Sequence, residues 1–516
     1  MQLNVLLRAG LRWGLQGCVL CLTVGIAPHV VWGGNLTTKQ AVASITSGEM
    51  QVVVELLADD SFEGRAAGSR GGRAAAGYLA KQFAALPLVG GGDKGSYFQS
   101  FGRGYRNILA LLEGSDPELK REVVVIGAHY DHVGYGKRTN SLGPIGYIHN
   151  GADDNASGTA AVLEVAEAIS QLNLRPKRTI LFALWDGEEA GLLGSKHWVA
   201  VPTLELSRIR FVVNLDMVGR LKNDELEVFG ARTAAGLRRL VCEQNASTRL
   251  KLKMPWKLEH NSDHAPFLLQ DIPVLMFHTG LHDDYHRPSD DAHLINYDGM
   301  QRVTRFAFGV INEVANLPAL PAFREASHRE YAFPRKRPKK MSFPPRLGMS
   351  WRREQGEMRV TRVTPRLPAA AGGLQVGDVV VQWNGQPVPD DTVFKQWVLA
   401  ASDSSTLQVR RAGTEELLEI PVTLQGRRTR VGLRWMMDEA EPEVGRVLNV
   451  FPGSAAELAG ITVGDRVYTV NGNGFQNNEE LRILLTTSKS PLTLQFERQG
   501  QIQTRTLEVP APSQSL

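Results

Sequence analysis

Acidic residues gather in this chain at places where little else explains them. The stretch GADDNASG sets Asp153 and Asp154 side by side just ahead of an apolar segment. Another acidic pair, Glu188 and Glu189, follows an apolar run, and so does Asp216. Adjacent carboxylates repel one another, so their grouping indicates that positive charge binds among them.

Four short apolar runs precede or surround these groups: EVVVIGA, RTILFALW, RFVVNLD and IPVLMFHT. Short runs rich in β-branched residues are typical of strands buried on both faces. Between the first two lies TAAVLEVAEAI, whose apolar residues have helical spacing. The alternation predicts an α/β fold with a mostly parallel or mixed central sheet and helices on both faces.

The chemistry-bearing residues fall just past the carboxyl ends of the expected strands. The first run leads into His129, the second into Glu188 and Glu189, and the third into Asp216, while HDDYHRPSDD with His286 follows the fourth. In an open parallel sheet this edge is where sites assemble. So many carboxylates at one edge predict that one or two divalent cations bind there.

Histidine mixed with carboxylate, without cysteine, suits zinc, and Mn²⁺ or Co²⁺ can take such sites too. A pair of ions needs a carboxylate that bridges them, and Asp154 is placed for that. His129 and Asp216 would complete the shell of one ion. Glu189 and His286 would complete the shell of the other.

Two neighbouring carboxylates have supporting roles in this hypothesis. Asp131 would accept the second imidazole N–H of His129 and fix the ring. Glu188 would take the proton from the water that bridges the two ions. Asp153 is assigned to helix capping or to support of the site. The remaining histidines singled out in the sequence are interpreted as surface or core residues: His132, His149, His197, His260, His264, His278, His282 and His293.

Five motifs in order, GAHYDH, GADDNASG, WDGEEAGLLGS, NLDM and YHRPSD, resemble the co-catalytic di-zinc aminopeptidase family, the exopeptidases of clan MH. The resemblance covers residues 45–316 and implies hydrolysis of amino-terminal residues from peptides with two Zn²⁺, using the ligands and base given above. It also implies that Tyr285 steadies the oxyanion. Carboxypeptidases, dipeptidases and glutaminyl cyclases of the same fold stay as alternatives.

The carboxyl-terminal part repeats itself at a spacing of about eighty residues. GLQVGDVVVQWNG in one copy and GITVGDRVYTVNG in the other resemble PDZ domains of the bacterial protease type, which implies two β-rich domains at 343–425 and 428–511. Such domains bind the carboxyl termini of peptides or proteins. Peptide binding by the first copy is less secure, because TPRLPAAAGGL replaces the usual turn. A peptide-binding scaffold with a secondary or inactive metal domain is the alternative function.

The rest of the chain bears on location. Residues 1–33 are predicted to be an export signal or a membrane anchor, which places the protein in the periplasm or outside the cell, anchored to a membrane only if the segment is not cleaved. Residues 35–316 form the predicted metal domain and 317–342 a basic, proline-rich linker. The net charge of +4 stems from RKRPKK in that linker, so no nucleic-acid partner is expected. Without Cys18 and Cys21 of the leader, Cys242 has no disulfide partner.

Overall fold

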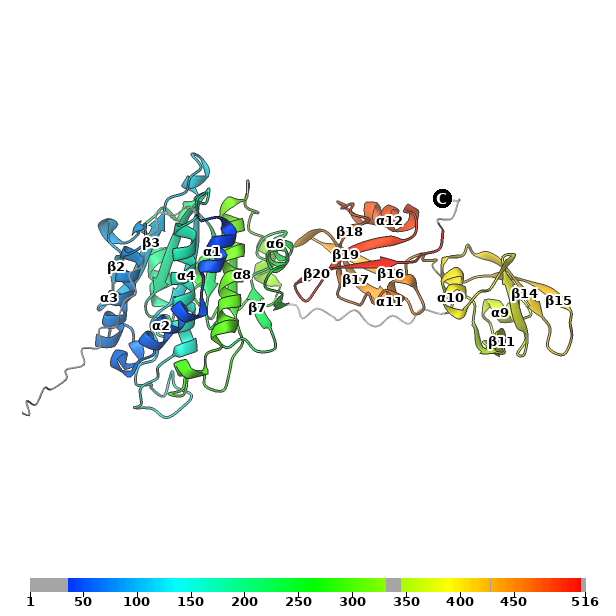
Figure 1. The fold of residues 1–516 in the computed structure, drawn as a ribbon, viewed down its shortest axis with the longest axis horizontal. Coiled ribbons are helices and arrows are strands. Elements are labelled where there is room, and N and C mark those ends of the chain that lie inside the picture. Colours follow the sequence, from blue (N-terminus) through cyan, green and yellow to red (C-terminus); the bar gives the residue numbers. More distant parts are fainter. Residues whose placement is uncertain (1–35, 331–344, 427, 512–516) are drawn as a thin grey trace, which may run out of the picture.

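The computed structural model describes residues 36–330, 345–426 and 428–511, and each of these ranges is built around its own sheet (Figure 1). They are called here the amino-terminal body, the first repeat and the second repeat. The predicted export segment 1–33 and the run RKRPKK lie outside the described residues. Within the described ranges, no helix is both long and apolar enough to cross a bilayer.

A nine-stranded mixed sheet forms the centre of the amino-terminal body. Its strands lie in the order β1-β3-β5-β4-β6-β9-β7-β8, and β2 pairs with β3. The four strands predicted from apolar runs are β4, β5, β6 and β9, and they are mutually parallel. The bounds are β1 (Val89–Gly90), β2 (Phe98–Phe101), β3 (Tyr105–Leu112), β4 (Val123–His129), β5 (Thr179–Trp185), β6 (Ile209–Leu215), β7 (Glu225–Phe229), β8 (Lys251–Lys253) and β9 (Val274–His278).

Helices cover both faces of this sheet, which confirms the predicted fold class. Alternate residues of β4 enter different cores: Val124 packs in the cluster that contains α4 and α8, and Val125 packs in the cluster that contains Trp198 of α5 and Phe267 of α7. The helices are α1 (Thr38–Ser44), α2 (Ser47–Leu57), α3 (Arg70–Ala84), α4 (Gly158–Ser170), α5 (Leu193–Ala200), α6 (Leu237–Gln244), α7 (Ala265–Leu268) and α8 (Tyr297–Asn316). Short 3-10 turns span Asp60–Arg65, Asp93–Gly95, Leu119–Arg121, Leu206–Arg208, Ala292–Leu294 and Glu325–Arg329, and a π turn spans Ala152–Ser157.

The two repeats have matching antiparallel sheets, as their sequence repetition predicts. The first contains β10 (Met349–Glu354), β11 (Glu357–Val363), β12 (Val379–Trp383), β13 (Gln386–Pro387), β14 (Ser404–Arg410) and β15 (Leu417–Thr423), with α9 (Pro368–Ala371) and α10 (Asp391–Ala400). The second contains β16 (Leu433–Asp438), β17 (Glu441–Val450), β18 (Arg466–Val470), β19 (Leu492–Arg498) and β20 (Gln501–Leu507), with α11 (Ala455–Leu458) and α12 (Asn478–Thr487).

The order of the three bodies in space differs from their order in the chain. The second repeat lies against the amino-terminal body, and the first repeat lies beyond it (Figure 1). Backbone hydrogen bonds join the docked pair: Leu252 N donates to Gln499 O at 2.8 Å, and Gly236 N donates to Ala440 O at 3.0 Å. The β19–β20 turn therefore lies beside β8, the last strand of the central sheet.

Buried charges also join the second repeat to the amino-terminal body. Arg238 of α6 makes a two-pronged contact with Glu497, at 2.9 and 3.1 Å, and Glu497 is fully buried. Arg466 makes a similar contact with Glu441 and lies 3.7 Å from Glu497. These four residues are called here the docking cluster. Because each carboxylate has an arginine partner, the cluster can be buried without an uncompensated charge.

The first part of the predicted linker packs against the amino-terminal body. Phe323 forms an isolated bridge with Ala234, and Arg324 N donates to Thr233 O at 2.7 Å. The Arg324 side chain donates to Arg232 O at 2.7 Å. Apolar and donor groups of this proline-containing stretch thus contact the amino-terminal body. Residues 317–330 therefore belong to that body in the structure.

Candidate metal centre

The strand register brings the predicted site residues to one edge of the sheet. His129 ends β4 opposite Trp185 of β5. Glu188 and Glu189 follow β5 directly, and Asp216 follows β6. Asp154 lies in the π turn that leads into α4, and His286 lies in the loop after β9. Parallel strands thus supply groups that are far apart in the sequence.

The five predicted ligands are in mutual contact. His129 Nε2 lies 3.3 Å from Asp154 Oδ1 and 3.4 Å from Asp216 Oδ1. His286 Nε2 lies 3.0 Å from Asp154 Oδ2 and 3.1 Å from Glu189 Oε2. Asp154 therefore stands between the two imidazoles with one oxygen toward each, and each imidazole also faces a second carboxylate.

The other nitrogen of each imidazole contacts a backbone carbonyl. His129 Nδ1 lies 3.1 Å from Asp131 O, and His286 Nδ1 lies 2.7 Å from Asn140 O. A carbonyl accepts a hydrogen bond, so both Nδ1 atoms carry protons and both Nε2 atoms face the carboxylates. Histidine ligands of metals usually have this arrangement, because the outer hydrogen bond fixes the ring.

The prediction for Asp131 differs from the structure in one respect. Its backbone carbonyl, rather than its carboxylate, contacts His129, since the carboxylate oxygen lies 3.8 Å from Nδ1. The carboxylate instead accepts backbone hydrogen bonds from Glu188 at 3.0 Å and Glu189 at 3.4 Å. Asp131 thus holds the acidic pair in place while its main chain orients the imidazole.

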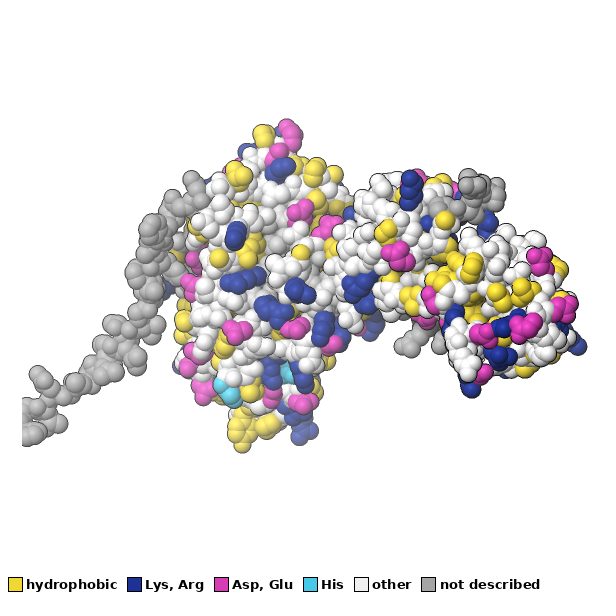
Figure 2. Space-filling model, turned by 45° about the vertical axis from the view of Figure 1, so that its right-hand side comes forward, with side chains coloured by type: hydrophobic (Ala, Val, Ile, Leu, Met, Phe, Trp, Pro, Cys, Tyr) yellow, Lys and Arg dark blue, Asp and Glu magenta, His cyan; other side chains and the backbone are white. Residues whose placement is uncertain are grey.

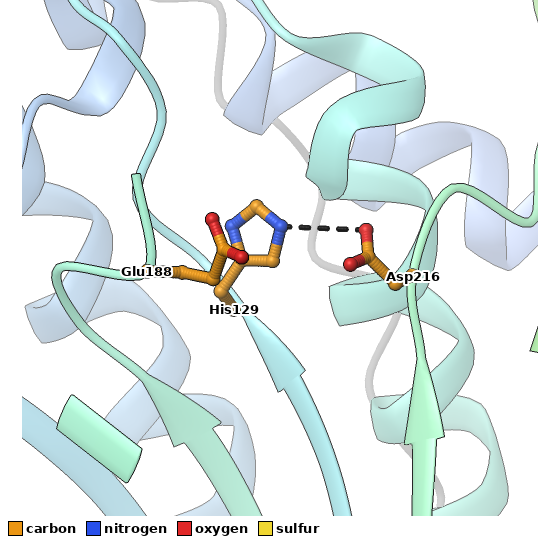
Figure 3. A group of neighbouring side chains, drawn as sticks. All are labelled: His129, Glu188 and Asp216. Carbon is orange, nitrogen blue, oxygen red and sulfur yellow. Dashed lines mark ion pairs between the residues drawn. The ribbon is translucent and has the colours of Figure 1, made fainter. Parts of the chain in front are cut away.

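Glu188 lies beside His129 but outside the five-residue set. Figure 3 shows Glu188, from the loop after β5, and Asp216, from the end of β6, on different sides of the His129 ring. Each of the three offers one ligand atom within 4.8 Å of the others. Burial raises the pKa of Glu188, and nearby Glu189 raises it further, although His129 opposes the shift.

His132 was interpreted from the sequence as a surface or core histidine, but it lies within the site. Its Nδ1 is 2.9 Å from Glu189 Oε1 and 3.9 Å from Asp154 Oδ2. Its Nε2 is buried and has no hydrogen-bond partner among the described residues. His132, Asp154 and Glu189 form a second group whose ligand atoms lie within 4.8 Å of one another. Its position three residues after His129, just past the same strand, was the available sequence signal.

Arg65 was also missed, and it anchors the backbone of the site. The arginine is fully buried in the 3-10 turn Asp60–Arg65. Its guanidinium donates to Tyr130 O at 2.9 Å, Gly151 O at 2.9 Å and Asn150 O at 2.6 Å. The arginine lies within the range 45–316 that resembled the family, but no local pattern singled it out. Since its donors bind carbonyls, Arg65 does not pair with the site carboxylates.

Carboxylates around the site hold its turns. Asp290 accepts backbone hydrogen bonds from Asp153 and Asp154, both at 3.0 Å. Asp153 Oδ1 accepts from Gly219 N at 2.7 Å and from Ser157 Oγ at 3.0 Å, and its other oxygen lies 3.1 Å from His282 Nε2. Asp153 thus has the supporting role that was one of the two expected from the sequence.

Tyr285 packs its ring on that of His286, with centroids 3.9 Å apart. Among the predicted site residues it is the one whose contact is a ring contact rather than an ionic one. The stacking, together with the Asn140 carbonyl, restricts the His286 ring from two sides.

The electrostatics of the site favour added positive charge. Burial lowers the pKa of His286, but Asp154 and Glu189 outweigh that effect and raise it to about 10. Burial raises the pKa of Asp154, yet its contacts with His129 and His286 bring the pKa well below the usual value. Protonated imidazoles are thus the ion-pair partners of these carboxylates among the described residues. Divalent ions would replace the imidazole protons, and histidine with carboxylate is a donor set that fits zinc.

Comparison with known proteins finds matches over both the amino-terminal body and the two repeats. Residues 107–311 match peptidase family M28, and residues 345–422 and 421–497 each match the PDZ domain. Leupeptin-inactivating enzyme 1 of Streptomyces exfoliatus is 33% identical over 178 residues, 34% of this chain and 36% of that protein. Probable leucine aminopeptidase 1 of Trichophyton verrucosum is 26% identical over 300 residues, 53% of this chain and 75% of that protein.

Solved structures, too, are similar to about half of the chain. The LapA aminopeptidase of Legionella pneumophila has 22% sequence identity and a TM-score of 0.46, covering 54% of this chain and 75% of that one. The aligned stretch spans only about a third of the Streptomyces relative, the first of those compared.

Proposed function

From the premise that the chain belongs to peptidase family M28 and ends in two PDZ domains, we propose that it is a zinc-dependent aminopeptidase acting on peptides. The observation that carries the proposal is the position of Asp154, whose two oxygens face His129 and His286 separately. A bridging carboxylate between two imidazole–carboxylate pairs is the arrangement that two adjacent divalent ions need. The relatives named as aminopeptidases support the reaction class.

Two zinc ions would be held by the residues already in contact, with Mn²⁺ or Co²⁺ as substitutes. His129 and Asp216 would bind one ion, Glu189 and His286 the other, and Asp154 both. Zinc in such a site supplies a Lewis acid that lowers the pKa of water and stabilises negative charge. His132 adds a buried nitrogen beside Glu189.

Glu188 is proposed as the general base. Its carboxyl lies beside His129 without being tied to a backbone donor, and its own N–H is fixed by Asp131. Burial raises its pKa, which strengthens it as a proton acceptor. Glu188 would take a proton from the attacking water and return it to the leaving amine. Tyr285, held against His286, is proposed to donate to the oxyanion.

The PDZ domains are proposed to bind peptide or protein carboxyl termini, and so to recruit substrate. β10 and β16 each stand at the end of a sheet with a helix nearby in the same repeat. A peptide could add a strand at such an edge. Export to the periplasm or the cell exterior is also proposed, and it is supported by the sequence pattern of residues 1–33 alone.

A substrate panel together with elemental analysis tests the proposal. The purified full chain should contain about two zinc ions and should cleave aminoacyl p-nitroanilides and peptides with a free amino end, but not the same peptides after acetylation. Cleavage of acetylated peptides from the carboxyl end would indicate a carboxypeptidase, and cyclisation of glutaminyl peptides a glutaminyl cyclase. Capture of carboxyl-terminal peptides without any cleavage would indicate a scaffold.

A further inference from the structure

One loop beside the site exposes an unusual share of apolar side chains. Residues 133–149, called here the rim loop, connect β4 to the turn that contains Asp154. Tyr135, Leu142, Ile145 and Tyr147 are 49, 59, 48 and 63% exposed. These four lie within thirteen residues, although exposed large hydrophobic side chains are otherwise scattered thinly over the described chain. Figure 2 shows hydrophobic and basic side chains gathered at the lower end of the amino-terminal body.

The rim loop is attached directly to the candidate metal centre. Asn140 O accepts from His286 Nδ1 at 2.7 Å, and Leu142 N donates to His286 O at 3.0 Å. Arg287, the next residue, has its side chain against Gly143. Leu142, one of the four exposed apolar residues, is therefore hydrogen-bonded through its main chain to a proposed zinc ligand.

Internal hydrogen bonds give the rim loop a defined shape. His149, the last residue of the loop, is fully buried, and its Nε2 lies 2.8 Å from Ser141 Oγ. The main chain closes on itself, since Gly146 N donates to Tyr135 O at 2.7 Å and His149 N donates to Gly134 O at 2.8 Å. Apolar groups held in place on a hydrogen-bonded frame lose little conformational entropy when they bind a partner.

Where a substrate would lie follows from the charge of the site. The interior, beyond His129, is lined by carboxylates and attracts a free ammonium group. An aminopeptidase substrate would therefore enter with its amino end first. His286, whose side chain is 13% exposed, is the most exposed of the five proposed ligands, so the rest of the peptide would extend outward past it. The rim loop is attached at that point.

Resting on the proposed aminopeptidase function, we propose that the rim loop binds apolar side chains of the residues that follow the scissile bond. The loop thereby selects peptides by their second to fourth residues, in addition to any selection of the first. Ile145 and Tyr147 carry this role, because their side chains are exposed and the loop residues that contact His286 are Asn140 and Leu142.

The test compares two tetrapeptides that share an amino-terminal leucine, leucyl-phenylalanyl-leucyl-valine and leucyl-seryl-glycyl-serine. In the wild type, kcat/KM should be higher for the apolar peptide. In the double variant Ile145→Ser/Tyr147→Ser, the ratio of the two kcat/KM values should fall about tenfold, mostly through KM. A matched control is Leu174→Ser, which changes a residue 79% exposed beyond the far end of α4 and should leave the ratio unaltered.

The outcomes separate the loop from the reaction. A wild-type protein that cleaves leucine p-nitroanilide, with a ratio that the double variant does not change, overturns the rim-loop proposal and leaves the aminopeptidase function standing. An equal loss on both tetrapeptides also overturns it. A double variant that instead loses binding to vesicles of anionic phospholipid, at an unchanged ratio, would assign the loop to a membrane surface. If the wild type does not cleave leucine p-nitroanilide, the proposed aminopeptidase function itself is refuted.

Discussion

Two buried groups of carboxylates in this chain are neutralised in different ways. In the docking cluster, Glu497 and Glu441 each meet an arginine through two contacts. At the candidate metal centre, the ion-pair partners of Asp154, Glu189 and Asp216 among the described residues are imidazoles, and the buried arginine nearby, Arg65, donates to backbone carbonyls instead. The chain thus supplies its own permanent cations where the role is structural. Where chemistry is expected, it leaves the charge to be supplied from outside.

A third kind of buried acid is neutralised neither by an arginine nor by a proposed metal ion. Glu164 of α4 is 7% exposed, and within the part of the chain that the structure describes its carboxylate accepts one hydrogen bond, from the Thr46 N–H at 3.3 Å. Burial raises its pKa to about 8, with Glu49 and Glu167 adding to the shift. A proton therefore neutralises Glu164 at neutral pH. Arginine, metal and proton are three ways of meeting the same cost of burying a carboxylate.

Metal removal should have the largest effect, because it strips only one of these groups of its cations. We expect dialysis against a chelator to reduce peptide hydrolysis to background and to lower the thermal midpoint of the amino-terminal body. Zinc should restore both, while the docking cluster stays intact. Elemental analysis confirms that zinc has been removed. Hydrolysis that persists in the zinc-depleted protein would contradict the view that metal ions neutralise the carboxylates of the candidate metal centre.

Glu188→Gln should come next, with a loss of about 10²–10⁴ in kcat, the usual contribution of a general base. The amide is nearly isosteric but cannot accept the proton. Because Glu188 is not among the five proposed ligands, zinc content should be unchanged, and this is the control measurement. A variant with normal kcat would remove Glu188 from the mechanism.

Arg238→Met should weaken the docking of the second repeat by about 3–5 kcal/mol, because it leaves Glu497 buried without its main partner. Urea unfolding measures the change. The double variant Arg238→Met/Glu497→Leu should recover most of it, since both charges are then absent. If the single variant is as stable as the wild type, the docking cluster does not stabilise the contact between the second repeat and the amino-terminal body.

Glu164→Gln should have a smaller effect that depends on pH. Because the folded pKa of about 8 is above the ordinary value of 4.5, the stability that the protonated carboxyl contributes is complete below about pH 4.5. It is lost as the pH rises through 8. The thermal midpoint of the wild type should therefore fall more between pH 5 and 9 than that of the variant. If the thermal midpoints of the two proteins change equally with pH, Glu164 is not the group whose titration lowers the stability.

The smallest effect is expected at an exposed pair. Lys253 and Glu225 lie 2.8 Å apart on neighbouring strands, with side chains 54% and 41% exposed. Water and salt screen such a pair, so Glu225→Gln should leave the urea midpoint within experimental error. A clear fall in the urea midpoint would mean that solvent exposure does not explain why this pair should contribute less stability than the docking cluster.

The site could be predicted from sequence where local pattern determines position. His129, Glu189 and Asp216 follow short apolar runs, and parallel strands carry whatever follows them to one edge. His132 was missed because a single histidine has no periodicity to distinguish it. Arg65 and the main-chain role of Asp131 depend on tertiary contacts, which the residue types alone do not encode.

The arrangement of the three bodies could not be predicted. Arg238 and Glu497 are separated by 259 positions, and each residue taken alone is typical of a solvated surface. The repetition near the carboxyl terminus predicted two similar sheets, but it contained no pattern that assigns one of them to the amino-terminal body. Only the packed structure shows which copy docks.

The docking of the second repeat matches a charge difference between the two copies. Where the second copy reads TLQFERQG, with Glu497, the first reads TLQVRRAG, with Arg410. In the first copy Arg410 contacts Glu357 of its own sheet, and placed at the interface it would confront Arg238. Exchanging the copies would therefore set like charges together. The interface charge therefore determines which copy can dock, and the surface of the first repeat that corresponds to it is not used for this contact.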